Sequence, residues 1–191
     1  MSELFSNTIF RLIPVVRSGD LDACERVVVQ QIRDLPRSPF HISIDVTISN
    51  DPADAARHFD RFFKREAHRF EIAAAYTEMN GFDINPNRWY CDLFAYASNG
   101  GHDDYEWLCD YQSELFEDYT IRGLEELQAV YARDLLEENS FGDASYMSSL
   151  LVVIKFQQFM KKAAAKMAEL SFPLLVTAHD FDFIAEVGPK A

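Results

Sequence analysis

Two kinds of apolar spacing alternate along the chain, and together they set the fold class. Spacings of three or four residues, typical of amphipathic helices, occur in residues 21–35, 51–69, 123–138 and 143–170. One-by-one alternation of apolar and polar residues, typical of strands, occurs in residues 40–49, and residues 88–98 fit a central strand whose two faces are both largely apolar. The sequence therefore predicts an α+β fold in a single domain over residues 1–191. We expect a mixed, mostly antiparallel β-sheet with helices packed on one face and one long C-terminal helix.

The predicted helix of residues 51–69 has the clearest start signal. Asp51 is a suitable N-cap, and Pro52 fits the first helical position because its missing N–H would have no partner there. The outer face of this helix carries a dense basic cluster, and His58 and His68 are expected to face solvent. The basic residues are Arg57, Arg61, Lys64, Arg65 and Arg69.

Other segments fit more than one local structure. Residues 8–16 contain Pro14 and fit a short edge strand or an irregular lead-in. Residues 70–79 fit a strand or a continuation of the preceding helix, and residues 105–112 fit a strand or a short helix. Further strands are predicted for residues 115–121 and 174–187.

Negative charge is concentrated in one part of the chain. The net charge is −13, and residues 101–143 hold 13 acidic residues against two basic ones, whereas the remainder is nearly balanced. Such a surface repels phosphate groups, which argues against direct binding of nucleic acid or of an anionic membrane. It attracts basic proteins and accelerates their encounter. The same acids are also consistent with a solvated face that aids solubility.

Aromatic side chains lie among the acids at the start of this stretch. Trp and Tyr inside a water-excluding rim are typical of interface hot spots, so we expect residues 103–119, the acidic segment, to bind a basic protein. The predicted contact residues are Asp103, Asp104, Glu106, Trp107, Asp110, Tyr111, Glu114, Glu117, Asp118 and Tyr119. Two alternatives stay open. The rings could face the core, or the basic helix of residues 51–69 could pair with the acids, within one chain or between the copies of a homodimer.

Histidine and carboxylate residues suggest a second class of function. His102, Asp103 and Asp104 follow two glycines, and His179 lies near Asp182, so a small metal-dependent hydrolase could use them if the two segments met across the sheet. On a strand, however, His179 and Asp182 would point to opposite faces. The common phosphate-binding and catalytic motifs are absent. The sequence therefore predicts no cofactor, no metal and no catalytic residue.

Asp92 is a separate candidate for chemistry. It lies among Tyr90, Phe94 and Tyr96 in a predicted strand. A carboxylate on an aromatic face would have a raised pKa and could act as a general acid. Alternatively, a tyrosine hydroxyl or a backbone amide satisfies it.

These observations favour a non-catalytic acidic protein-binding module, of the inhibitor or immunity-protein type that masks a basic partner. The metal-dependent hydrolase is the alternative. The three cysteines form no C-x-x-C pair, no run in the sequence is long enough to cross a membrane, and we expect no secretory signal. We therefore expect a cytoplasmic protein.

Overall fold

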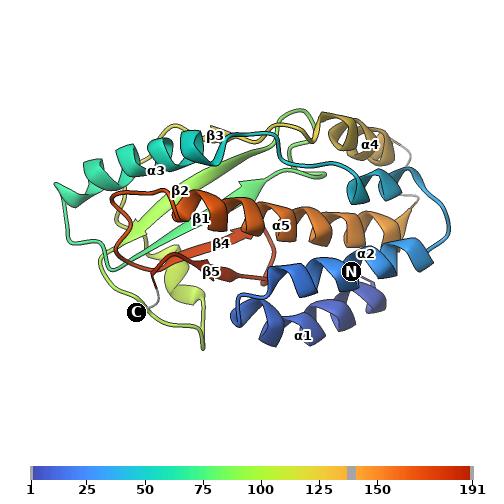
Figure 1. The fold of residues 1–191 in the computed structure, drawn as a ribbon, viewed down its shortest axis with the longest axis horizontal. Coiled ribbons are helices and arrows are strands. Elements are labelled where there is room, and N and C mark those ends of the chain that lie inside the picture. Colours follow the sequence, from blue (N-terminus) through green and yellow to red (C-terminus); the bar gives the residue numbers. More distant parts are fainter. Residues whose placement is uncertain (1, 137–140, 190–191) are drawn as a thin grey trace.

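The computed structural model describes residues 2–136 and 141–189, whose arrangement is shown in Figure 1. The helices are α1 (Glu3–Arg17), α2 (Leu21–Asp34), α3 (Pro52–Ala67), α4 (Glu125–Leu136) and α5 (Gly142–Ala164), with short 3₁₀ helices η1 (Pro39–Ile44) and η2 (Glu106–Cys109). The strands are β1 (Ala74–Asn80), β2 (Tyr90–Tyr96), β3 (Tyr119–Thr120), β4 (Leu174–Ala178) and β5 (Ala185–Val187).

The strands form one mixed sheet in the order β3-β2-β1-β4-β5. β1 pairs in parallel with β4, whereas the β1–β2, β2–β3 and β4–β5 pairs are antiparallel. The parallel pair requires a crossover, and the chain between β1 and β4 includes α4 and α5. The predicted α+β fold with a mostly antiparallel sheet is therefore confirmed.

One face of the sheet packs against α3 and α5 (Figure 1). Its side chains are small or apolar and buried, which lets the helices approach closely. On the central strands they are Ala75, Met79, Cys91, Leu93, Ala95, Leu174, Val176 and Ala178. α5 is buried along most of its 23 residues and also packs on α2 and η1. Among the described residues, no helix is both long enough and apolar enough to cross a membrane.

The opposite face, called here the second face, is polar and aromatic. β1 presents Tyr76, Glu78 and Asn80 on it, and β2 presents Phe94, Asp92 and Tyr90 in the matching register. The chain that follows β2 covers one end of this face, where Trp107 packs on Tyr96. Most of the side chains on the second face are therefore half-buried rather than sealed inside the core.

The predicted start signal of α3 is confirmed, and Asp20 caps α2 in the same way. Asp20 Oδ1 accepts a hydrogen bond from Ala23 N at 3.0 Å, and Asp51 Oδ1 accepts one from Ala53 N at 2.9 Å. α5 ends at Ala164 rather than Leu170. The predicted strand of residues 88–98 is present as β2, and residues 105–112 contain a short helix, η2.

The prediction of a strand over residues 40–49 is wrong, because this segment forms η1 and a following loop. In η1 the buried side chains are Phe40, His41 and Ser43, which belong to both sides of the alternation. The cause is a long-range contact with α5. The Lys155 ammonium donates hydrogen bonds to the carbonyl oxygens of Ser43 (2.8 Å), Ile44 (2.9 Å) and Val46 (2.6 Å), which a strand would have used in a ladder.

The N-terminal stretch is also a helix rather than a strand or an irregular lead-in. α1 buries Phe5, Thr8, Leu12 and Val16, which share one helical face, and it accommodates Pro14 in its last turn although a proline there cannot donate a helical hydrogen bond. The predicted strand of residues 174–187 is split into β4 and β5 by a turn at Asp180, whose φ is 63°. Of residues 115–121, only Tyr119–Thr120 pairs as a strand.

Candidate functional site

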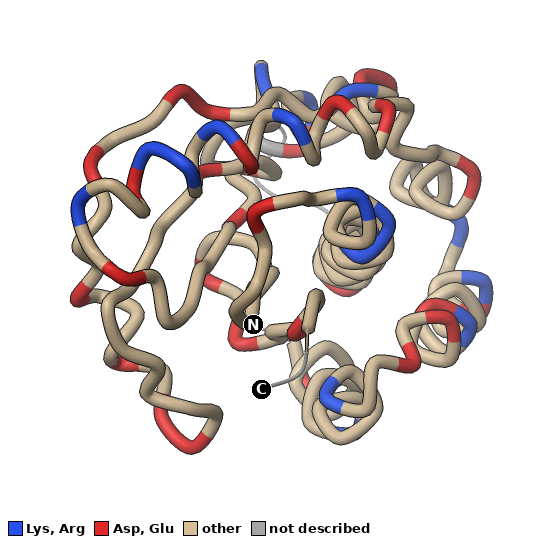
Figure 2. The backbone as a smooth tube through the Cα atoms, turned by 60° about the vertical axis from the view of Figure 1, so that its left-hand side comes forward, with Lys and Arg blue, Asp and Glu red and all other residues tan. Residues whose placement is uncertain are grey.

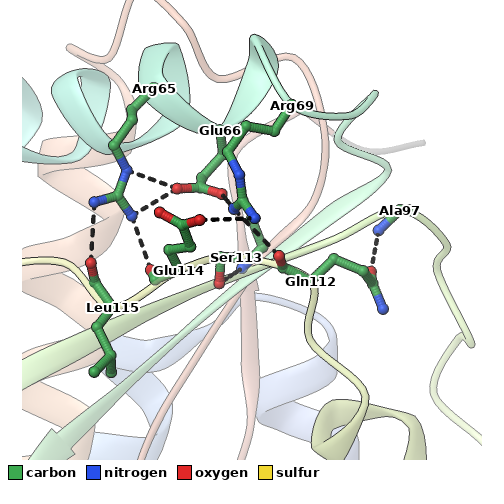
Figure 3. Close-up of polar contacts among 9 residues, drawn as sticks. Arg65, Glu66, Arg69, Ala97, Gln112, Ser113, Glu114 and Leu115 are labelled. Atoms are coloured by element: carbon green, nitrogen blue, oxygen red, sulfur yellow. Dashed lines mark hydrogen bonds and ion pairs between the residues drawn. The ribbon is translucent and has the colours of Figure 1, made fainter.

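The second half of the acidic segment, residues 112–118, extends the edge of the sheet beside β2. Gln112 N donates to Ala95 O at 3.1 Å, and Ala95 N donates to Ser113 Oγ at 3.1 Å. The Gln112 side chain accepts from Ala97 N at 2.7 Å (Figure 3). These contacts continue the β2–β3 pairing along the edge. We call residues 112–118 the anchored segment.

Arg65 of α3 and Arg69, two residues beyond the end of that helix, hold the anchored segment, as Figure 3 shows. The Arg65 guanidinium donates to the carbonyl oxygens of Glu114 (2.8 Å) and Leu115 (3.0 Å). Arg69 lies 3.2 Å from the Glu114 carboxylate. Between the two arginines, the completely buried Glu66 carboxylate accepts from both and fixes their orientation.

Two further ion pairs neutralise acids of the anchored segment. Arg61 pairs with Glu117, and Arg88 pairs with Asp118. Figure 2 shows the basic positions of α3 beside acidic positions of the neighbouring chain. The in-chain pairing with residues 51–69 that the sequence left open therefore occurs for Glu114 and Glu117, whereas Asp118 pairs with Arg88 from outside that stretch.

His58 is buried against the anchored segment, so the prediction that it faces solvent is wrong. Its ring lies 5.2 Å from the rings of both Phe116 and Tyr119, and its Nε2 lies 3.0 Å from Glu117 O. Arg61 Nη2 lies 3.2 Å from the other ring nitrogen. Burial lowers the pKa of His58, and the positive charge of Arg61 adds to this, although the contact with Glu117 O acts in the opposite direction.

The first half of the acidic segment has a different environment. We call residues 102–111 the acidic loop. Four of its carboxylates are exposed and have no Lys or Arg partner in the part of the chain that the structure describes: Asp103, Asp104, Glu106 and Asp110. The structure thus divides the acidic segment into a paired part and an unpaired part, a division that no sequence pattern indicates.

The acidic loop is nevertheless fixed to the body of the protein. His102 Nε2 lies 2.9 Å from a Glu186 carboxylate oxygen on β5, and Arg17 donates to His102 O at 3.1 Å. Trp107 packs edge-on against Tyr96 with ring centroids 4.9 Å apart. A Cβ atom at Gly100 would lie only 2.3 Å from the Trp107 ring, so a glycine is required there.

The aromatic residues of the acidic segment therefore have different roles. Trp107 and Tyr119 are partly buried, and their polar atoms contact Gly101 O at 3.2 Å and the Asn50 side chain at 3.2 Å, respectively. Tyr111 is 46% exposed, with its ring 4.9 Å from that of Phe94. It is the predicted contact ring that is most available to a partner, and Leu115 adds an apolar side chain that is 90% exposed.

Glu78 and Asp92 lie directly opposite each other on the second face. Tyr76 donates its hydroxyl hydrogen to Glu78 at 2.8 Å, and Asn80 donates to Asp92 at 2.8 Å. Burial raises the pKa of Asp92, and the negative charges of Glu78 and Asp118 raise it further. The raised pKa expected from the sequence is therefore confirmed. The hydrogen bond to this carboxylate comes from an asparagine rather than from a tyrosine or a backbone amide. Glu78 and Asn80 were not identified from the sequence, although their alternation with Thr77 and Met79 indicates their shared face.

The structure does not bring the two histidine segments together. His102 contacts Glu186, whereas His179 Nδ1 lies 3.2 Å from Glu78 and its Nε2 lies 3.7 Å from Asp180. In the described ranges, no three His, Cys, Asp or Glu residues form a group that could hold a metal ion.

Comparison with protein-family models, with curated proteins and with solved structures finds no match to this chain.

Proposed function

We propose that this chain is a non-catalytic binding module whose acidic loop captures a basic protein and masks it, as an inhibitor or immunity-type protein would. One observation carries the proposal: Asp103, Asp104, Glu106 and Asp110 are exposed together and lack a cationic partner in the described residues, beside the exposed ring of Tyr111. Carboxylates around an aromatic residue steer a basic partner and then supply the polar rim of the contact.

The attachment of the acidic loop supports this function. A loop that is already ordered loses little conformational entropy when it binds, and this saving appears as affinity. The contacts of His102, just before the cluster of carboxylates, and of Trp107, within it, supply that order. The anchored segment has a supporting role in this proposal, because its acids already pair with arginines of the same chain.

A charge-neutralised variant tests the proposal. Asn replaces Asp103, Asp104 and Asp110, and Gln replaces Glu106. The probes are hexalysine and hexa-arginine peptides in titration calorimetry. We expect the affinity to fall by roughly tenfold or more, because each exposed ion pair contributes ~0.2–1 kcal/mol. Glu114 and Asp118 are left unchanged, because their substitution would break in-chain ion pairs.

The matched control removes the same amount of charge elsewhere on the surface. It replaces the exposed residues Glu3, Glu71, Glu126 and Glu169 with Gln. Under the proposal this control keeps its affinity within about twofold, since long-range attraction is largely screened at physiological salt. An equal loss in both variants would show that net charge alone attracts the peptides, and the proposal would fail.

A further inference from the structure

The second face leaves two carboxylates in register on neighbouring strands. Glu78 and Asp92 are cross-strand partners of β1 and β2, and like charges placed directly opposite each other are destabilising. The Glu78 side chain is only 18% exposed and Asp92 is half-buried, so water screens the pair incompletely. A cation bound beside the pair would therefore relieve the repulsion between the two carboxylates.

The charged groups around the pair compensate it only in part. His179 lies 3.2 Å from Glu78, and it adds positive charge only when protonated. Arg88, whose positive charge acts on Asp92, is already paired with Asp118. Asp92 accepts from Asn80 through Oδ2 alone, and within the described residues its other oxygen has no hydrogen-bond donor. One acceptor of the pair is thus available for a donor from outside the chain.

The chain itself shows how an arginine binds on this face. The Arg88 guanidinium lies over the Tyr90 ring, 4.5 Å from its centroid, and pairs with Asp118 at the same time. The neighbouring cross-strand pairs of β1 and β2 combine the same two kinds of group, an aromatic ring and a carboxylate. Tyr76 and Phe94 stack with ring centroids 5.8 Å apart and 29° between their planes, and they are the next cross-strand pair beside Glu78 and Asp92.

The second face is continuous with the acidic loop. The Phe94 ring contacts the exposed Tyr111 ring at 4.9 Å, so Tyr76, Phe94 and Tyr111 form an aromatic row from the carboxylate pair to the loop. A protein docked on the acidic loop would therefore have the carboxylate pair within reach of a long side chain.

We propose that Glu78 and Asp92, with the flat surface of Tyr76 and Phe94, bind an arginine side chain of the basic partner. This inference rests on the proposed function, because the partner is the protein that the acidic loop captures. Arginine fits better than lysine. Its planar guanidinium both stacks on rings and donates several hydrogen bonds to carboxylates in fixed directions, whereas an ammonium group is a compact, strongly hydrated charge.

The test compares two neutralised variants of the full chain. E78Q/D92N removes both charges of the pair while keeping the side-chain shapes, and E71Q/E169Q removes two exposed charges elsewhere. By calorimetry, we expect E78Q/D92N to bind hexa-arginine roughly tenfold more weakly than E71Q/E169Q does. The unmodified chain should bind hexalysine more weakly than hexa-arginine. Amide NMR shifts caused by hexa-arginine should include residues 76–80 and 90–94.

Several outcomes would overturn the inference. Equal hexa-arginine affinity in the two variants would exclude the pair as a binding site. If only the loop variant lost affinity, the proposed function would stand and this inference would fail. If only E78Q/D92N lost affinity, the pair would remain and the loop would not be the capture site. Equal binding of both peptides would exclude a preference for arginine. Stabilisation by Mg²⁺, Ca²⁺ or Mn²⁺ that E78Q/D92N abolished would instead make the pair a metal site.

Discussion

The buried carboxylate of Glu66 is the centre of the contact between α3 and the anchored segment, and its removal gives the sharpest test of that contact. It is fully buried and accepts from Arg65 Nε at 2.7 Å, from Arg65 Nη2 at 2.6 Å and from Arg69. The same two arginines reach the backbone of the anchored segment. Without Glu66, they lose the group that positions them.

We expect Glu66→Ala to lower the free energy of unfolding by about 3 kcal/mol. Breaking a buried ion pair costs ~3–5 kcal/mol. The lower end applies because the Arg65 and Arg69 side chains are 35% and 37% exposed, so water solvates them once they are released. Glu66→Gln keeps the shape and one carbonyl acceptor, and it should lose about half as much.

Urea unfolding at neutral pH, followed by the fluorescence of Trp89 and Trp107, measures this loss. Because Glu66 is buried, the loss should stay constant between about 0.05 and 0.5 M salt. Glu117→Gln is the contrasting variant, since Glu117 and its partner Arg61 are each 62% exposed. It should lose no more than about 1 kcal/mol, and less at high salt. A loss below about 1 kcal/mol for Glu66→Ala would refute the central role of this carboxylate.

Three other variants test single interactions. The pKa of His58 is lowered from 6.5, so on acidification the unfolded chain binds a proton at a higher pH than the folded chain does. The free energy of unfolding should therefore fall as the pH drops below about 6.5, and His58→Gln should remove this part of the pH dependence of urea unfolding. The pKa of Asp92 is raised from 3.8, so ionising this carboxyl costs more free energy in the folded chain than in the unfolded chain. Asp92→Asn should therefore stabilise the protein by about 0.5–1 kcal/mol at neutral pH, measured by thermal unfolding, and the gain should vanish towards pH 3.8. Lys155→Met should lower stability by about 2 kcal/mol and speed amide hydrogen exchange in residues 43–47, since three carbonyls lose their shared donor.

The parts of the fold that could be predicted are those governed by local sequence. Asp20 and Asp51 cap α2 and α3 through hydrogen bonds to amides two or three residues ahead, so sequence spacing alone identifies them. α1 could also have been predicted, because the residues that it buries have helical spacing: Phe5, Thr8, Leu12 and Val16. Pro14 made an extended structure look more plausible than it was.

The segment that failed depends on a contact that is distant in sequence. Residues 40–49 alternate as a strand does, yet Lys155 lies more than a hundred residues away and takes up the carbonyl oxygens. No local pattern in a single sequence indicates which lysine will be buried against which carbonyl. The alternation was therefore real, but tertiary structure decided the outcome.

The negative charge of the candidate site could be predicted from the sequence, but which of its acids are paired within the chain could not. Composition alone reveals the acidic excess of residues 101–143. Which of these acids are paired depends on Arg61, Arg69 and Arg88, which are distant in sequence. Arg61 and Arg69 reach the anchored segment because α3 packs beside β2. Asp92 was recognised from its aromatic neighbours, whereas its partner Glu78 required the strand register.

The remaining choice is between a binding surface and a surface that only aids solubility. Carboxylates that serve solubility need no fixed geometry, and they perform equally well on a mobile loop. In this chain the unpaired acids follow a glycine that lets Trp107 pack closely, and His102 joins their loop to Glu186 on the far edge of the sheet. Residues 102–111 are thus held in place by contacts that solubility does not require, which favours a partner that recognises their arrangement.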